Sequence, residues 1–201
     1  MTVLTKFSEK TLYDYQQNDL DTIFDYLDSA PTDTNLLYQL PTGGGKTVVF
    51  SEIAKRYIAT KGKKVVVLTH RIELSTQTSK MLEGFGVHNK IINSDVKSLE
   101  DQEDFSCFVA MVETLNNRLQ EEKVSLDNIG LVIIDEAHYN SFRKLMKFFK
   151  HAVILGVTAT PLSSNIKLPM KDHYKKLIVG ESITSLIDKK FLAQAHLYNK
   201  N

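Results

Sequence analysis

Short apolar runs alternate with longer amphipathic stretches along most of this chain. The runs are rich in β-branched residues and bounded by polar residues or glycine, which indicates strands buried on both faces, at residues 35–40, 64–69, 87–92, 106–112, 130–135 and 152–157. Apolar residues recur at helical spacing over residues 48–58, 74–82 and 143–150, and a last helix is expected at the domain edge over residues 182–192. This alternation predicts an α/β fold, with a parallel sheet and helices on both of its faces.

We expect residues 1–201 to form one domain, because no internal repeat, low-complexity tract or Pro- or Gly-rich linker divides them. Residues 95–104 and 162–176 are expected to be surface excursions. No apolar run approaches the roughly 20 residues that a membrane span requires. The first 15 residues also lack the hydrophobic centre of a secretion signal. The expected location is therefore the cytoplasm, with no membrane partner.

The composition refines this picture in three ways. Residues 1–142 carry 14 basic and 21 acidic side chains, whereas residues 143–201 carry 11 and 3. Such a basic tail is as consistent with a nucleic-acid footprint as with a solvated lysine surface. The single cysteine, Cys107, lies in an apolar run and is expected to be buried and inert. The 21 Lys, 4 Arg and 11 Asn indicate an AT-rich coding sequence, as in a phage or a low-GC bacterium.

A glycine-rich segment, Leu-Pro-Thr-Gly-Gly-Gly-Lys-Thr at residues 40–47, leaves a predicted strand and enters a predicted helix. In a phosphate-binding loop of this kind, successive backbone N–H groups face one point and the helix N-terminus adds positive charge. Lys46 would reach the β- and γ-phosphates of ATP and the Thr47 hydroxyl would bind Mg²⁺. The remaining cofactor contacts are assigned to Thr42, Gly43, Gly44 and Gly45. The loop departs from the usual pattern at Leu40, where Gly or Ala is common, and a plain glycine-rich turn is the alternative.

A second motif, Asp-Glu-Ala-His at residues 135–138, follows the apolar run at 130–135. A carboxylate at the end of a strand beside a phosphate loop can hold the Mg²⁺ shell, which we assign to Asp135. Glu136 is then placed to orient or deprotonate an attacking water. The next run ends at Thr158 and Thr160, which puts two hydroxyls at the same edge of the sheet. Taken alone, these residues would be a chance acidic turn and ordinary turn-forming threonines.

Together these motifs resemble the first motor domain of superfamily 2 helicases, specifically the XPB-like and type III restriction-type group with an Asp-Glu-Ala-His box. The resemblance implies a RecA-like P-loop NTPase fold and an ATP-dependent helicase or translocase that uses Mg²⁺. It also implies that Gln16 reads the adenine edge, with Tyr13 where that family usually has Arg. His138 is implied to be catalytic and to connect the Mg²⁺ site with Thr158 and Thr160, which couple the nucleotide state to movement.

Residues 67–74 and 112–118 resemble the motifs of this family that touch a nucleic-acid backbone, so the resemblance assigns such contacts to Thr69, His70, Arg71, Thr114 and Arg118. Hydroxyls, arginines and helix N-termini at strand ends suit phosphate contacts, which carry no base code. Read without the family, Arg71 and Arg118 are ordinary surface arginines. Backbone contacts do not report the 2′-hydroxyl, and only the resemblance favours DNA over RNA.

Motors of this group combine two RecA-like lobes, and the second lobe supplies an arginine finger. Only 40 residues follow Pro161, and the arginines at positions 56, 71, 118 and 143 include none beyond 143. Because such fingers contribute about 10³ to 10⁵ in turnover, we expect weak Mg-ATP binding, hardly any hydrolysis and no unwinding without a second lobe in cis or in trans. Two alternatives are a nucleotide-switched binding module and a small-molecule kinase, which would leave residues 135–138 and 158–160 unexplained.

Overall fold

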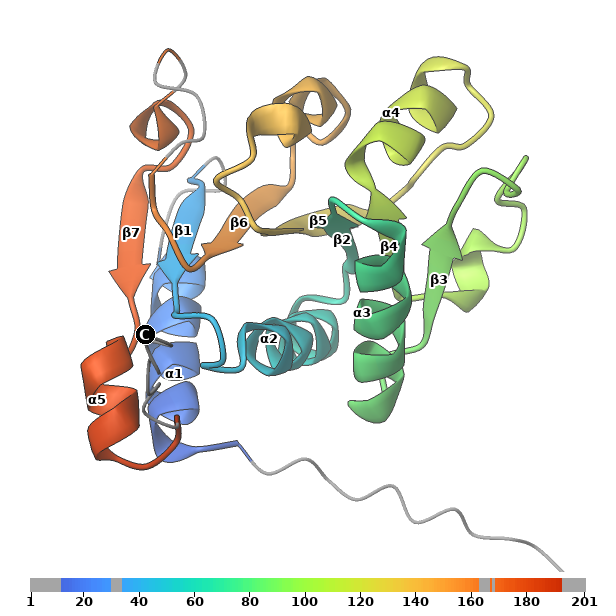
Figure 1. The fold of residues 1–201 in the computed structure, drawn as a ribbon. Helices are drawn as coiled ribbons and strands as arrows, with labels where there is room; N and C mark the ends of the chain where they lie inside the picture. Colours follow the sequence, from blue (N-terminus) through green and yellow to red (C-terminus); the bar gives the residue numbers. More distant parts are fainter. Residues whose placement is uncertain (1–11, 30–33, 163–166, 168, 193–201) are drawn as a thin grey trace, which may run out of the picture.

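The computed structural model describes residues 12–29, 34–162, 167 and 169–192. Within these residues the core is a parallel sheet in the order β3-β4-β2-β5-β6-β1-β7 (Figure 1). Its strands are β1 (Leu36–Gln39), β2 (Lys64–Thr69), β3 (Asn89–Ile92), β4 (Cys107–Met111), β5 (Ile129–Asp135), β6 (Val153–Thr158) and β7 (Lys176–Val179). Each of the six apolar runs contains a strand, so the expected parallel sheet is confirmed.

Helices cover both faces of the sheet (Figure 1). One face carries α1 (Asp14–Ser29), α2 (Lys46–Lys61), α3 (Ile72–Gly84) and α5 (Ile183–Asp188). The other carries α4 (Val112–Gln120) and the 3₁₀ segments η2 (Asn140–Phe148) and η3 (Met170–Asp172), while η1 (Gln102–Asp104) lies between β3 and β4. None of the described helices is long and apolar enough to cross a bilayer.

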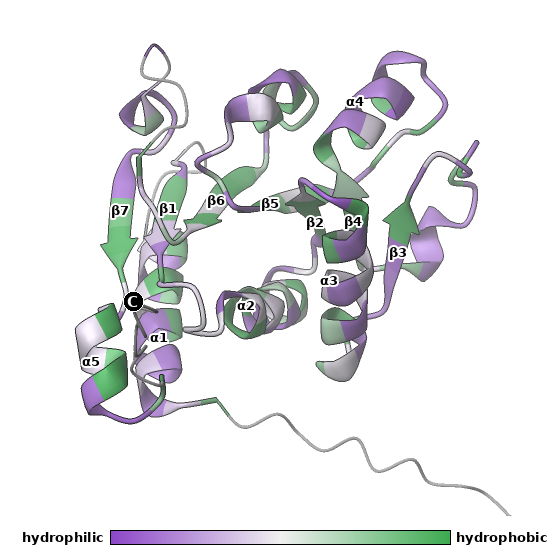
Figure 2. Cartoon of the chain, viewed as in Figure 1, coloured by the Kyte–Doolittle hydropathy of each residue, from purple (hydrophilic) through white to green (hydrophobic). Residues whose placement is uncertain are grey.

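The central strands are buried on both faces, which explains their unbroken apolar runs. In β2, Val65 and Val67 belong to the core beneath α1, α2 and α3, whereas Val66 and Leu68 belong to the core on the opposite face. Figure 2 shows the hydrophobic colour concentrated on the strands and hydrophilic residues on the outer helices. Cys107 is fully buried and its burial raises the pKa of its thiol, as expected for an inert residue.

Residues 140–148 form a 3₁₀ segment rather than the expected α-helix over 143–150. Phe142 and Leu145 are its buried residues and are spaced three apart, which matches the three residues per turn of a 3₁₀-helix. The helix expected over 182–192 is also shorter, because α5 ends at Asp188.

The expected surface excursion at residues 162–176 is wrong in part. Met170 and Tyr174 are buried in the core beside α4 and η2, and the chain then forms β7, an edge strand absent from the expectation. Three of the four β7 residues are exposed, so the strand lacks the apolar run that identifies a buried strand.

Gly156 of β6 has no room for a side chain, because an added Cβ would collide with the Tyr174 hydroxyl and lie 2.8 Å from the Ala137 Cβ. We expect Gly156→Ala to lower the free energy of unfolding by about 1 to 3 kcal/mol, as overpacked cores do. Gly84, at the end of α3, has open space around it and serves as the matched control. Urea titrations of both variants test this, and Gly84→Ala should be neutral or slightly stabilising. Equal stability of the two variants would contradict the packing described at Gly156.

Candidate nucleotide-binding site

Three loops converge at the carboxyl edge of the sheet, because β5, β6 and β1 are neighbours in it. The loop after β1 holds residues 40–47, the loop after β5 holds residues 135–138, and β6 ends at Thr158. The Leu40 amide donates to the Thr158 carbonyl at 3.0 Å, and Lys46 Nζ lies 3.2 Å from Glu136 Oε1. The three motifs, which are spread over residues 40–160 of the sequence, therefore form one site.

The loop after β1 has the backbone of an anion-binding turn. Gly43 and Gly45 have φ of +85° and +83°, in the left-handed region where glycine is favoured. The Gly44 amide donates to the Pro41 carbonyl at 2.9 Å, and α2 starts directly afterwards. Gly45 caps α2 without a side-chain hydrogen bond, which leaves the first N–H groups of the helix for a ligand. Leu40, the departure from the common pattern, is fully buried and packs against Gly44.

Helix α1 holds this loop from the side. The Tyr15 hydroxyl donates to the Gly44 carbonyl at 2.7 Å, and Gln16 Nε2 approaches the same oxygen at 3.4 Å. Gln16 is only 3% exposed, and its Oε1 accepts from the Tyr13 amide at 3.0 Å. The rings of Tyr13 and Phe191 lie 4.5 Å apart beside it. Tyr15 was not identified from the sequence as a site residue. Its position next to Gln16 was the only feature of the sequence that could have indicated this role.

The two carboxylates after β5 differ in environment. Asp135 is 8% exposed, and its burial, followed by the neighbouring Glu136 charge, raises its pKa to about 6, against the opposing effect of Lys46. Its Oδ1 accepts from the Glu136 amide at 3.0 Å. Glu136 has φ of +52°, a left-handed conformation that costs a non-glycine residue about 1 to 3 kcal/mol. Such strain is retained at functional sites where the surrounding structure fixes it.

Asp135→Asn is expected to stabilise the metal-free protein at neutral pH. Because the folded-state pKa is above the ordinary value of 3.8, the folded state binds the extra proton between about pH 4 and 6, and stability falls as pH rises through that window. Above it, the ionised carboxylate costs about 3 kcal/mol, so the variant should gain roughly 9 °C in Tm. Thermal unfolding in EDTA at pH 7.5 and at pH 4 tests this. A gain in Tm that persists at pH 4 would show that it does not come from removing the ionised carboxylate of Asp135.

His138 connects this loop to the end of β6. Its Nδ1 lies 3.0 Å from Thr158 Oγ1 and 3.4 Å from Glu136 Oε2. Thr158 is fully buried, donates from Oγ1 to the Thr160 carbonyl at 2.9 Å and accepts from the Thr160 amide at 3.0 Å. Thr160 is exposed at the rim. A continuous series of contacts therefore runs from Lys46 through Glu136 and His138 to the threonine loop.

The residues assigned to nucleic-acid contacts lie in different surroundings. Thr69 is fully buried, and its hydroxyl is 2.6 Å from that of Ser75, so it shapes the turn into α3 and presents no free hydroxyl. Arg71 precedes α3 and is exposed. Thr114 and Arg118 are partly exposed on α4, and Arg118 donates to the Ser94 carbonyl.

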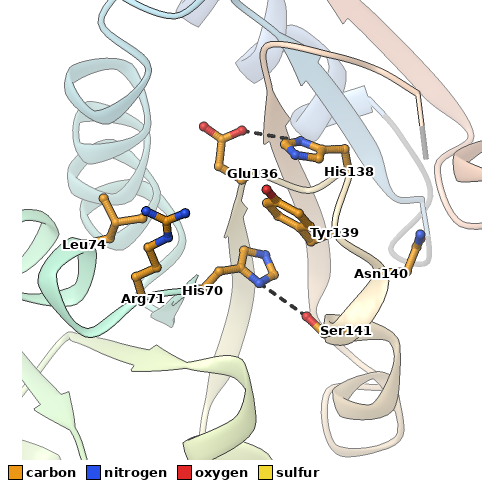
Figure 3. A pocket seen from close by; sticks show the side chains of 8 residues that line it. All are labelled: His70, Arg71, Leu74, Glu136, His138, Tyr139, Asn140 and Ser141. Atoms are coloured by element: carbon orange, nitrogen blue, oxygen red, sulfur yellow. Dashed lines mark hydrogen bonds and ion pairs between the residues drawn. The ribbon is translucent and has the colours of Figure 1, made fainter. Parts of the chain in front are cut away.

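His70 is half-buried and faces the loop after β5. It lines a pocket of about 750 Å³ together with Arg71, Leu74, Glu136, His138, Tyr139, Asn140 and Ser141 (Figure 3). Burial, followed by the neighbouring His138, lowers the pKa of His70. The pocket joins the end of β2 to the loop after β5.

The site is compatible with a nucleotide whose phosphates provide part of the Mg²⁺ coordination. The described residues contain no group of three His, Cys, Asp or Glu side chains able to hold a metal by themselves. Mg²⁺ in phosphoryl-transfer sites is held by one or two carboxylates together with substrate phosphates and waters. Thr47 and Asp135 are the residues that would complete such a shell, beside the free N–H groups at the start of α2.

Two solved structures illustrate the likeness of the fold. The Type ISP restriction-modification enzyme LlaGI, solved as a nuclease-deletion mutant with a DNA substrate mimic, aligns with a TM-score of 0.71 and 19% identity over 90% of this chain and 21% of its own. The Pyrococcus furiosus Hef helicase domain aligns with a TM-score of 0.64 and 23% identity, covering 80% of this chain and 37% of that one. These structures share the RecA-like fold with this chain.

The sequence comparisons are more specific. The family model for the Type III restriction enzyme, res subunit, matches residues 9–163, and the chain belongs to that family. The helicase-family protein IRC3 of Saccharomyces cerevisiae is 30% identical over 94% of this chain and 29% of its own length. A 51.5 kDa protein of a Lactococcus phage is 33% identical over 81% and 32%, respectively. The chain thus spans about a third of the length of these relatives.

Proposed function

We propose that this lobe binds Mg-ATP and drives an ATP-dependent nucleic-acid helicase or translocase, hydrolysing ATP only with a second RecA-like lobe. One observation carries the proposal, the convergence of Lys46, Asp135 and Glu136 at one sheet edge with the glycine turn before α2. Each residue type there has a separate task in phosphoryl transfer.

The chemistry follows from the positions of these groups. The backbone of residues 42–45 and the start of α2 hold the phosphates, and Lys46 neutralises their charge. Thr47 and Asp135 would hold Mg²⁺, which would supply positive charge beside the transferred phosphoryl group. Glu136 orients the attacking water and accepts its proton. Gln16 contributes to base recognition from α1, where it already contacts the loop.

Nucleic acid would bind across the ends of β2 and β4. Arg71 and Arg118 offer guanidinium groups, and Thr114 offers a hydroxyl near the start of α4. Closure of the two lobes around ATP would move this surface through His138, Thr158 and Thr160. We favour DNA, in line with the DNA substrate mimic in the LlaGI structure and with the resemblance of the motifs. We also propose that the protein is a cytoplasmic motor encoded by a phage. The similarity to the 51.5 kDa protein of a Lactococcus phage supports a phage origin.

Fluorescence anisotropy with labelled single-stranded DNA, double-stranded DNA and RNA of equal length tests this interface. We expect salt-dependent binding that favours DNA and that Arg71→Ala weakens severalfold, because a lost phosphate contact removes both charge and hydrogen bonds. Arg56→Ala is the control, since Arg56 pairs with Glu52 and Asp21 on α2 and α1. Equal losses in both variants would contradict the interface. A preference for RNA would overturn the choice of DNA, and strand separation by the chain alone would contradict the need for a second lobe.

A further inference from the structure

A cluster of four side chains joins two loops that lie far apart in the sequence. His70 Nδ1 lies 3.3 Å from the Ser141 hydroxyl, and the His70 ring meets the Tyr139 ring edge-on with centroids 4.9 Å apart. The Tyr139 ring in turn lies 4.2 Å from the ring of His138. Figure 3 shows Tyr139 between the two histidines, with Glu136 bonded to His138 above them.

The cluster links the proposed nucleic-acid surface to the proposed nucleotide site through contacts that are separate from those of the threonine loop. His70 stands between Thr69 and Arg71, at the end of β2 where nucleic acid is proposed to bind. Tyr139 directly follows His138 in the loop that carries Glu136. This route does not include Thr158, which contacts His138 Nδ1 at 3.0 Å, or Thr160, which contacts Thr158.

The His70 ring is held in a conformation that a second arrangement could improve. Its Nε2 is buried and has no hydrogen-bond partner among the described residues, although the Glu136 backbone faces the ring. A buried nitrogen without a partner costs free energy that a small rotation toward an acceptor would recover. Ser141 and Tyr139 oppose such a rotation in the present arrangement.

We propose that His70 is a positioning residue that, through Tyr139, ties the nucleic-acid side of the lobe to Glu136 and His138. This inference rests on the proposed function, since it assumes that ATP and nucleic acid bind at the two ends of the cluster. A shift of Arg71 on binding a phosphate moves His70, its neighbour in the chain. The Tyr139 ring, which packs against both histidines, passes that shift to His138. Closely packed side chains transmit a displacement because they have little free space in which to absorb it.

Histidine side-chain NMR of the 201-residue chain tests the route directly. Resonances of His70 and His138 are assigned with His70→Gln and His138→Gln, and exposed His88 near β3 serves as the internal control. Saturation with Mg-ATP should shift both His138 and His70, and a single-stranded DNA oligonucleotide should shift both as well. In Tyr139→Ala, Mg-ATP should shift only His138 and DNA only His70. Tyr139→Phe, which keeps the ring, should behave like the wild type.

Equilibrium binding gives the second readout. Saturating DNA should change the Kd for Mg-ATP by about fivefold in the wild type and in Tyr139→Phe, a usual size for coupled sites, and by less than about twofold in Tyr139→Ala. The Kd values for each ligand alone should agree among the three proteins. Cross-shifts or coupling that survive Tyr139→Ala would overturn the inference while leaving the proposed function intact. A wild type that binds no nucleotide would overturn the proposed function and the inference together.

Discussion

Glu136→Gln is expected to lower ATP turnover by about 10² to 10⁴, the usual contribution of a general base, when the lobe acts with its second lobe. Glutamine keeps the shape of the side chain and one oxygen, but it cannot accept the proton of the attacking water. The affinity for Mg-ATP should stay within about threefold of the wild type, because the phosphate contacts come from the loop after β1 and from Lys46. The variant loses the ion pair between Lys46 and residue 136, so Lys46 remains available to the phosphates. Steady-state hydrolysis and equilibrium titration with Mg-ATP measure the two quantities.

Glu121→Gln is the matched control for this experiment. Glu121 lies at the end of α4, where Lys123 lowers the pKa of its carboxyl, and it is remote from the three loops of the site. Its replacement should leave both turnover and affinity unchanged. Turnover of Glu136→Gln close to the wild type would mean that another group removes the proton, and Glu136 would then be only a partner of Lys46.

Lys46→Ala is expected to weaken Mg-ATP binding by about 100-fold, which corresponds to the loss of charged hydrogen bonds worth about 3 kcal/mol. Lys46 is largely buried and its ammonium group is held at the mouth of the loop by Glu136 at 3.2 Å. Removing it eliminates the positive side chain nearest the phosphate site and leaves the Glu136 charge facing the phosphates. Titration of both proteins with Mg-ATP gives the ratio of the Kd values.

Lys55→Ala controls for the loss of a lysine from the same helix. Lys55 is exposed on α2, about two and a half turns after Lys46, and its replacement should not change the affinity for Mg-ATP. A Lys46→Ala protein that binds Mg-ATP as tightly as Lys55→Ala would show that the glycine turn is not the phosphate site.

The architecture was predictable because it depends on local patterns. Runs of β-branched residues separated by helical periodicity place β1 to β6, and strand ends in a parallel sheet share one edge. The positions of residues 40–47 and 135–138 after such runs were therefore enough to bring the loop and the carboxylates together. Strand β7 was missed because it is a four-residue edge strand with mostly exposed side chains.

The finer features of the site depend on rotamers and on packing between distant segments. Tyr15 reaches Gly44 across 29 positions, and Ser141 reaches His70 across 71. Neither contact leaves a periodic signal in the sequence. The burial of Thr69 was equally invisible, because a threonine at a strand end is as compatible with an inward hydroxyl as with an outward one. The catalytic, metal and coupling roles of the site residues stay predictions.

The most direct test of the account is steady-state ATP hydrolysis by this chain with and without DNA, using Lys46→Ala as the blank, beside a Mg-ATP binding titration. We predict that the wild type binds Mg-ATP and that its turnover equals the blank, because most of the turnover is expected to depend on an arginine from a second lobe. Adding a second lobe should restore DNA-stimulated turnover. DNA-stimulated turnover above the blank by the chain alone would contradict the claim that the lobe needs a second one for chemistry.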